Sequence, residues 1–296
     1  MKALRQSTIY SYLRCPYQHF LQSAEPDKRT FRHPAAMHGT VLHGLIKRLH
    51  EGDWEMDLQA AYLLAFQHEV TNGQNDTLPV RWKDEAEERD QYLSDAVAML
   101  EGYRSKDYNR TCKILMAEAQ FTVKMGRHQL TGTLDQLRQH PDGTLELVDF
   151  KSGKTAPPQA YVDLDYQLSI YAYALLHGTL LVDGKLLQPR ILPDRLTLYF
   201  LRHHIPYKRA SGGKSAGEER GDPRISTTRN LDQLKAMKQD VAHVSRMMKA
   251  GCYPRSPDPM KCGVCAFADA CRGATQDAHL PMARLETLIT QLEDVA

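Results

Sequence analysis

Residues 113–151 constrain the fold more than any other part of the chain, because three apolar runs are separated there by very short connections. Gly126 marks the first connection, and Pro141-Asp142-Gly143 marks the second. Such residues are typical of tight turns, and connections this short join antiparallel neighbours. The sequence therefore predicts an antiparallel meander, with strands over 113–124, 128–138 and 144–151.

Helical spacing surrounds this meander. Pro16 should interrupt the first helix, because proline lacks the amide hydrogen that a helix needs. The pattern predicts helices over 7–22, 37–50, 57–70, 83–103, 163–177 and 230–250, and a further strand over 195–201. Helices, then strands, then helices again favour an α/β (α+β) fold in which helices flank a mixed central sheet.

The length of 296 residues is enough for one large domain with a sizeable core. We expect a single domain over 1–296. Within it, a catalytic sheet core should cover 112–201, and a helical insertion should cover 51–105.

Charge is unevenly distributed along the chain. The formal net charge is only +2, which excludes a polybasic coat as the main source of nucleic-acid affinity. Residues 51–101 nevertheless hold 13 acidic and three basic side chains, whereas residues 202–261 hold 13 basic and six acidic ones. The basic part includes a Gly- and Ser-rich segment, 208–223, that we expect to be a flexible loop suited to tracking phosphates. The acidic part should avoid DNA or contact a basic partner.

The sequence has no stretch close to the roughly 20 apolar residues that span a bilayer, and its first residues lack the features of a secretory signal. We expect no membrane association and a cytoplasmic location. In that reducing compartment, clustered cysteines are more often metal ligands than disulfides.

Two carboxylates and a lysine fall on neighbouring predicted strands. Asp149 and Lys151 share a strand face, and a hairpin brings Asp135 beside Asp149. Facing carboxylates repel unless a cation neutralises them, and Mg²⁺ or Mn²⁺ suits such ligands. Lys151 is then placed to position or deprotonate a water for phosphodiester hydrolysis. Farther along the chain, Gln167 and Tyr171 share a helix face.

Cysteines form a second pattern, in which three lie close together and one lies far away. These are Cys262, Cys265, Cys271 and the distant Cys15. Four thiolates bind either Zn²⁺ or an iron–sulfur cluster, and the spacing alone leaves both open. Cys112 is expected to be a small buried hydrophobe, and Cys252 is not expected to be a ligand.

In their order along the chain, these motifs resemble the PD-(D/E)XK nuclease superfamily in its RecB-like branch. They are similar to CRISPR-associated RecB-like iron–sulfur exonucleases and to the nuclease domains of AddB-type proteins. The matching segments are Tyr12-Leu13-Arg14-Cys15-Pro16, Gly39-Thr40-Val41-Leu42-His43, Gly132-Thr133-Leu134-Asp135, Asp149-Phe150-Lys151-Ser152-Gly153-Lys154, Gln167 with Tyr171, and Cys262-x₂-Cys265-x₅-Cys271. Each segment is weak singly, but the ordered combination is specific.

The resemblance implies a restriction-endonuclease-like sheet and assigns a role to each matching residue. The metal ligands would be His43, Asp135, Asp149 and the carbonyl of Phe150. Lys151 would act on the attacking water. Gln167 and Tyr171 would help to orient Lys151 or the DNA backbone. Glu118, on the first strand of the meander, resembles an auxiliary acid of relatives.

The resemblance also favours a [4Fe–4S] cluster over Zn²⁺. Its ligands would be Cys15, Cys262, Cys265 and Cys271. Such a cluster would clasp the N-terminal segment to residues 251–275 and act as a structural staple.

The resemblance implies a DNA exonuclease that uses Mn²⁺ or Mg²⁺ and cleaves single-stranded ends in the 5′→3′ direction. The context would be CRISPR adaptation, recombination and repair, or phage DNA metabolism, with a CRISPR integrase or helicase and recombination proteins as partners. The chain has no phosphate-binding loop of the G-x-x-x-x-G-K-[ST] type, so unwinding would come from a partner. Tyr199, Phe200 and Tyr207 are candidates for stacking on bases.

Two alternatives remain open. The first is an adaptor subunit of a CRISPR integration or recombination complex that cleaves DNA poorly or not at all by itself. The second is a structural Fe–S or Zn DNA-binding module, which would bind DNA without cutting it.

Overall fold

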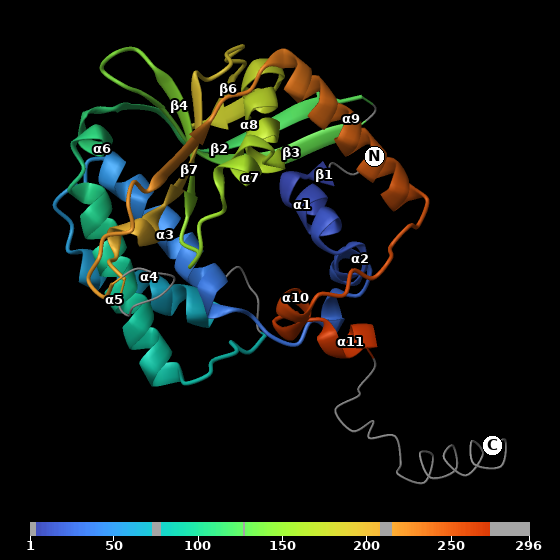
Figure 1. The fold of residues 1–296 in the computed structure, drawn as a ribbon, viewed down its shortest axis with the longest axis horizontal. Helices are drawn as coiled ribbons and strands as arrows, with labels where there is room; N and C mark the ends of the chain where they lie inside the picture. The colour runs from blue at the N-terminus through green and yellow to red at the C-terminus, as the bar shows by residue number, and fades with distance from the viewer. Residues whose placement is uncertain (1–3, 73–77, 127, 208–214, 273–296) are drawn as a thin grey trace, which may run out of the picture.

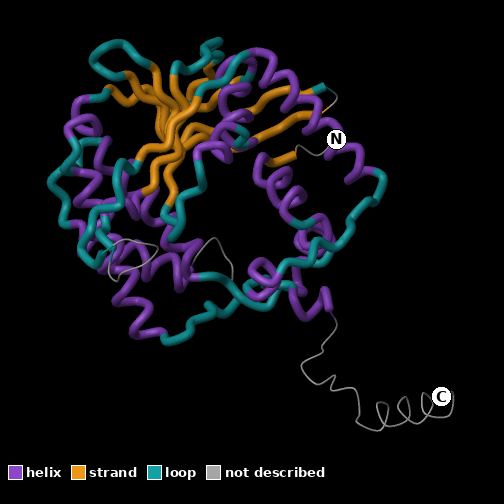
Figure 2. The backbone as a smooth tube through the Cα atoms, viewed as in Figure 1, coloured by secondary structure: helices purple, strands orange, loops and turns teal. Residues whose placement is uncertain are grey.

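The computed structural model describes residues 4–72, 78–126, 128–207 and 215–272. Within these residues the strands form one mixed sheet in the order β6-β5-β2-β3-β4-β7-β8, and β1 pairs with β3 outside this path. The pairs β4–β7 and β1–β3 are parallel, and the remaining pairs are antiparallel. Figure 1 and Figure 2 show this sheet with helices around it.

The strands are β1 (Leu4–Arg5), β2 (Lys113–Met125), β3 (His128–Gln139), β4 (Leu145–Lys151), β5 (Thr179–Val182), β6 (Lys185–Leu187), β7 (Arg195–Phe200) and β8 (Arg224–Thr227). The helices of the first half are α1 (Gln6–Arg14), α2 (Pro16–Ala24), η1 (Pro26–Lys28), α3 (Pro34–His50), α4 (Leu58–Asn72), α5 (Glu85–Arg104) and α6 (Asp107–Thr111). Those of the second half are α7 (Gln159–Asp163), α8 (Tyr166–His177), η3 (Leu201–His204), α9 (Leu231–Lys249), α10 (Pro259–Gly263) and α11 (Ala268–Arg272).

Helices cover the sheet on both faces and create two apolar cores. One core lies under α8 and α9 and includes Leu147 of β4. The other lies between the sheet and α3, α4 and α5, and it includes Val148 and Phe150 of the same strand. Successive residues of β4 therefore enter opposite cores, as the pleat of a strand requires. Because helices cover both faces of β4, the polar residues of this strand are either buried or lie at its end, in the site.

Side-chain caps fix where the helices beside the site begin. The Asp165 carboxylate accepts a hydrogen bond from the Leu168 N–H at 2.8 Å and so caps α8. On the other face, Asp84 caps α5 by accepting from the Glu87 N–H at 3.0 Å. The cap of α8 sets the helix phase at which Gln167 approaches the sheet.

The two ends of the described chain pack together. The Tyr17 N–H donates to the carbonyl of Pro254 at 3.2 Å, and the Thr30 N–H donates to that of Ala266 at 3.1 Å. Accordingly, α1 and α2 lie beside α10 and α11, although they come from opposite ends of the sequence (Figure 1). Backbone hydrogen bonds thus hold the cysteine-rich segment against the N-terminal helices.

The structure confirms the predicted meander, the mixed sheet and the six predicted helical regions. Cys15 separates α1 from α2, as the missing amide of Pro16 requires. The short strands β5, β6 and β8 were not predicted, because three or four residues carry too little alternation to be recognised. Residues 208–214 of the predicted loop lie outside the described residues.

Residues 51–105 are part of the main body and not an appendage. Tyr62 of α4 and Met99 of α5 lie in the same core as Val148 and Tyr199 of the sheet. The predicted insertion therefore supplies most of the covering of one sheet face. None of the described helices combines the length and the apolar character needed to cross a bilayer.

Candidate active site

Two neighbouring strands change face at the same level, and this change creates the site. In β2, Met116 and Ala119 belong to the same core, although a regular strand would place them on opposite faces. Glu118 lies between them with a φ of 50°, in the left-handed region. That conformation resets the alternation, and it costs a non-glycine residue about 1–3 kcal/mol.

The neighbouring strand β3 shows the same reset. Leu134 and Leu137 both face the core under α8, with Asp135 between them. The register pairs Ala117 with Gln136 and Ala119 with Leu134, so Glu118 stands opposite Asp135. The two acidic residues are thus held side by side, at the point where both strands turn their side chains over.

His43 completes this group from the sheet face opposite α8 and α9. It projects from α3, and its Nδ1 lies 3.4 Å from Asp135 Oδ2 and 3.8 Å from Glu118 Oε1. One ligand atom from each of the three side chains lies within 4.8 Å of the others. No other such group of three or more His, Cys, Asp or Glu occurs among the residues that the structure describes.

A backbone contact fixes the histidine ring. The Nε2 of His43 is 3.1 Å from the carbonyl oxygen of Phe150, so the ring donates through Nε2–H. In a neutral imidazole the other nitrogen is then an acceptor. The lone pair of Nδ1 therefore faces the carboxylates of Asp135 and Glu118. Three electron-pair donors that point toward one another fit a divalent cation, and imidazole with carboxylate suits Mn²⁺ or Mg²⁺.

The end of β4 contributes a second cluster beside the first. The Nζ of Lys151 forms an ion pair with Asp149 Oδ2 at 2.5 Å and donates to Gln167 Oε1 at 3.0 Å. The amide nitrogen of Gln167 donates to the Tyr171 hydroxyl at 2.7 Å. The lysine is thus held between a strand carboxylate and a helix amide, which is in turn fixed by a tyrosine.

Backbone geometry couples the two clusters. The Phe150 N–H donates to Asp135 Oδ2 at 2.8 Å. The last ladder pair of β3 and β4 is Gln136 with Val148, so one more step along this register sets Asp135 against Asp149. This is the juxtaposition that the hairpin predicts. In this structure, however, the side chain of Asp149 binds Lys151 and stands outside the His43–Glu118–Asp135 group.

Burial and like charge disturb the acids strongly. Burial raises the pKa of Asp135 well above its usual value of 3.8, and the charges of Asp149 and Glu118 raise it further, while the Phe150 hydrogen bond opposes the change. Burial also raises the pKa of Glu118, against the opposing effect of His43. A cation between these groups would relieve both effects, since it favours the ionised carboxylates.

Lys151 is a cation in this arrangement. Burial is the largest influence and lowers the pKa of Lys151, but the charge and hydrogen bond of Asp149 outweigh it, so the pKa is raised above 10.5. Lys151 can therefore orient a ligand and stabilise negative charge, and it is not a base while Asp149 holds it. Burial, with the charges of Asp149 and Asp135, raises the pKa of Tyr171 well above 10.0, so its hydroxyl stays neutral.

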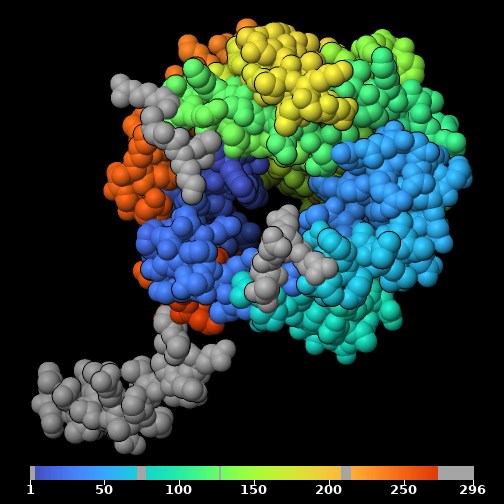
Figure 3. Space-filling view, turned by 180° about the vertical axis from the view of Figure 1, so that it is seen from behind, coloured from blue at the N-terminus to red at the C-terminus, as the bar shows by residue number. Residues whose placement is uncertain are grey.

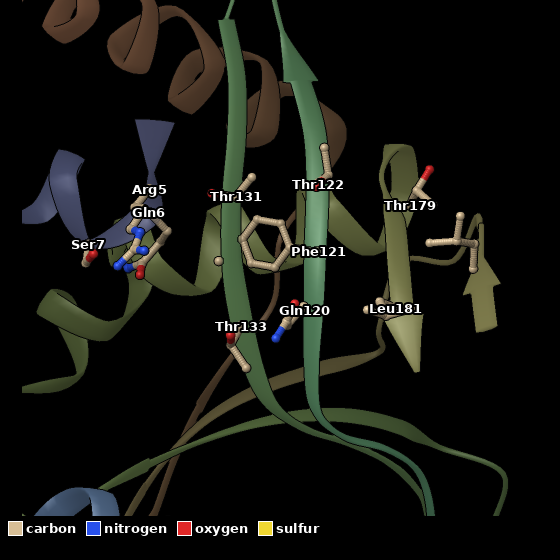
Figure 4. Close-up of a pocket in the computed structure, with 12 residues that line it drawn as sticks. Arg5, Gln6, Ser7, Gln120, Phe121, Thr122, Thr131, Thr133, Thr179 and Leu181 are labelled. Atoms are coloured by element: carbon tan, nitrogen blue, oxygen red, sulfur yellow. The ribbon is translucent and has the colours of Figure 1, made fainter. Parts of the chain in front are cut away.

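An open groove runs along β2 and β3 (Figure 4). It has a volume of about 830 Å³, and residues of β1, α1, β5 and β6 also line it. Gln120 and Thr133 face each other across β2 and β3, two residues from Glu118 and Asp135. Arg5, at the end of β1, borders the same groove. Seen from behind, the molecule is visibly hollowed between the N-terminal helices and the sheet (Figure 3).

The four predicted cysteine ligands lie where the chain ends meet, but no three of their sulfurs, all in described residues, are within 4.8 Å of one another. Burial raises the pKa of Cys265, and the nearby thiols of Cys15, Cys271 and Cys262 raise it further. Cys252 is exposed, and its carbonyl accepts a hydrogen bond from the hydroxyl of Tyr12. Cys112 is buried, as its position predicts.

A mixed sheet with buried acids and a lysine at the end of a central strand defines the class of metal-dependent nucleases. A family model for the PD-(D/E)XK nuclease superfamily matches residues 3–272, and the chain belongs to this superfamily. Among solved structures, one described as "Crystal structure of SSO0001" shares 12% identity with a TM-score of 0.33, over 64% of this chain and 78% of that one. A search of curated proteins gives no match.

Proposed function

We propose that the protein is a DNA exonuclease that hydrolyses phosphodiester bonds at single-stranded ends. The superfamily supports a metal-dependent nuclease, and the finer assignment is our own. The observation that carries it is the position of Lys151, which is held by Asp149 and Gln167 directly beside the His43–Glu118–Asp135 group.

The side chains divide the work between metal binding and substrate orientation. His43, Glu118, Asp135 and Asp149 would hold Mn²⁺ or Mg²⁺. When bound, the cation would activate water and neutralise charge on the scissile phosphate. The carbonyl of Phe150, which now accepts from His43, retains a second lone pair for the same ion.

Lys151 would contact the phosphate or the attacking water while its partners hold it in place. Gln167 limits the freedom of the long lysine chain, and Tyr171 fixes the amide orientation of Gln167 through a single hydrogen bond. An ammonium held in advance in a partly buried site stabilises developing negative charge without having to reorganise.

The groove of Figure 4 supports a nucleic-acid substrate. Its hydroxyl and amide groups repeat in pairs along β2 and β3, Gln120 with Thr133 and then Thr122 with Thr131. Two residues along a strand advance by about 6.6 Å, so these pairs offer polar groups at a regular spacing along the groove. Such groups bind phosphate and sugar and read no base, so cleavage should have little sequence specificity.

We further propose that Cys15, Cys262, Cys265 and Cys271 bind a [4Fe–4S] cluster. Their mutual approach supports a shared metal group. Four thiolates can hold either Zn²⁺ or an iron–sulfur cluster, and we choose the cluster because of the resemblance to RecB-like iron–sulfur exonucleases.

The central test uses DNA strands labelled at the 5′ or the 3′ end, incubated with the protein and Mn²⁺. We expect mononucleotides or short products from single strands and, following the family resemblance, 5′→3′ progress. A circular single strand is the matched substrate without ends, and it should persist. Efficient cutting of the circle would contradict exonuclease action, and loss of all cleavage at every label would favour an adaptor role beside an integrase or helicase.

A further inference from the structure

We call the group of Asp149, Lys151, Gln167 and Tyr171 the lysine cluster. A second cavity has a lining that includes Asp165 and Tyr166, at the start of the helix that carries Gln167. Its volume is about 690 Å³, and it is formed by α1, α7 and α10. Tyr10, Leu13 and Arg14 line it from α1, Tyr161 and Leu164 line it from α7 and the segment after it, and Lys261 lines it from α10. We call this cavity the tyrosine pocket.

The tyrosine pocket gathers apolar side chains that face solvent. Tyr10 is 47% exposed and Tyr161 is 48% exposed, and no other Phe, Tyr or Trp in the described ranges is exposed to this degree. Leu164 is 77% exposed at the same place. Aromatic side chains are normally buried at least partly, so two exposed rings in one cavity indicate a ligand with a flat apolar face.

Basic side chains accompany these rings. Arg14 and Lys261 approach the pocket from different helices, and neither is buried. The Nζ of Lys261 forms an ion pair with Asp258 Oδ2 at 3.9 Å, and the Lys261 side chain is 43% exposed, so solvent and ligands can reach the ammonium. A pocket with two exposed aromatic rings and two cations fits a nucleotide, in which a base is joined to a phosphate.

The pocket adjoins the lysine cluster. Asp165 lines the pocket, and the charges of Asp149 and Lys151 affect the pKa of its carboxyl, which burial raises. Lys151 likewise acts on Tyr161, whose pKa burial and the neighbouring Tyr10 raise to about 12. A strand with its phosphate at Lys151 therefore has a neighbouring nucleotide within reach of the tyrosines.

We infer that the tyrosine pocket binds one unpaired nucleobase of the DNA strand, stacked on Tyr10 and Tyr161, next to the phosphate that is cut. This inference rests on the proposed function, because it takes DNA as the substrate. A base inside a duplex is already stacked and paired, so only a single strand can supply the face that the tyrosines need. The pocket thus accounts for a preference for single strands. Two of the three candidates from sequence, Tyr199 and Phe200, cannot do this because both are buried, whereas Tyr207 is partly exposed.

The first experiment leaves the protein unchanged and alters the DNA. A single abasic position is moved along a labelled single strand, and the dissociation constant is measured by fluorescence anisotropy without a divalent cation. Loss of one stacked base should weaken binding about 5- to 150-fold at one position, with small effects elsewhere. Equal affinity at all positions overturns the inference.

The second experiment alters the pocket. The double variant Tyr10→Ala/Tyr161→Ala should weaken binding of the intact strand by the same factor and should show no further loss at the sensitive abasic position. Tyr10→Phe/Tyr161→Phe keeps both rings and should retain most of the affinity. Leu64→Ala is the matched surface control, because Leu64 on α4 is 77% exposed, as is Leu164.

The outcomes separate this inference from the proposed function. If Mn²⁺-dependent cleavage occurs but neither the abasic scan nor the alanine variant changes affinity, the pocket assignment is wrong and the nuclease assignment stands. If binding depends on one base but no strand is ever cut, the nuclease assignment fails and the pocket remains a single-strand binding site.

Discussion

Glu118 and Asp135 face each other across β2 and β3 at the one level where both strands reverse their side-chain alternation. The left-handed φ of 50° at Glu118 produces this reversal in β2. Strain of this kind persists only where surrounding structure enforces it, and here it places two carboxylates next to His43. The strained conformation costs local stability, and it brings together the side chains of the proposed cation site.

Replacement of Glu118 should separate strain from function. Glu118→Gly and Glu118→Ala both remove the carboxylate, but only glycine adopts a φ of 50° without strain. We expect the glycine variant to be more stable than the alanine variant by about 1 kcal/mol. Both should need about 10- to 100-fold more Mn²⁺ for half-maximal cleavage. Denaturant unfolding and metal titration measure the two effects. Because glycine loses more backbone entropy on folding than alanine does, an alanine variant that is the more stable of the two would show that no strain is stored there.

Removal of the buried charge at Asp135 should stabilise the protein without metal. The pKa of Asp135 is raised in the folded state, so the folded protein holds this proton more tightly than the unfolded chain does. Its contribution to stability is therefore present at low pH and is lost as pH rises through the raised pKa. We expect Asp135→Asn to raise the melting temperature at pH 8, with little effect at pH 4.

With Mn²⁺ bound, the unaltered protein should be more stable than Asp135→Asn at pH 8. Mn²⁺ favours the ionised carboxylate, so it should raise the melting temperature of the unaltered protein more at pH 8 than at pH 5. Asp135→Asn should lose most of that rise. Scanning calorimetry of both proteins at the two pH values, with and without Mn²⁺, measures these rises in melting temperature. A rise that is independent of pH would contradict the coupling.

The lysine cluster should control the chemical step. Asp149→Ala leaves Lys151 without its ion-pair partner and removes a proposed metal ligand, and we expect kcat to fall by at least about 100-fold. Gln167→Ala should cost less, since Asp149 still holds the ammonium. Circular dichroism and iron content should stay unchanged in both variants. Undiminished cleavage by Asp149→Ala would refute the assignment of this site.

The cysteines should divide into ligands and bystanders. Cys265→Ser should abolish the brown colour and iron content of protein purified without oxygen and should lower the melting temperature. Cys252→Ser is the matched control, because Cys252 lies in the same segment but is exposed and is not one of the four proposed ligands. Colourless protein with one bound zinc would favour the alternative metal.

Local spacing was enough to predict the two pairs that form the lysine cluster. Asp149 and Lys151 share a strand face because the pleat has a period of two, and Gln167 and Tyr171 share a helix face because they are four residues apart. The contact between the two pairs was implied only by the family resemblance. The meander, its turns and the break at Cys15 follow from equally local rules. The family resemblance added His43 and Glu118, which no spacing rule places beside Asp135.

What the sequence could not reveal depends on tertiary contacts. Alternation alone cannot place Glu118 beside Asp135, because the reset depends on one left-handed residue inside a strand. The ion pair of Arg138 with Glu146 is another case, since both side chains are fully buried although charged strand residues normally face solvent. Tyr10 and Tyr161 belong to helices far apart in the sequence, and only the fold brings them into one pocket.

The contact between Tyr17 and Pro254 can form only late in the synthesis of the chain. The N-terminal helices leave the ribosome first, but their packing partners follow more than 200 residues later. At about 5–20 residues per second, Cys15 waits more than about ten seconds before Cys271 is made. During that interval its thiol is accessible to oxidants and to stray metals. Maturation should therefore be sensitive to oxidation while the chain is being synthesised and much less so once its ends have met.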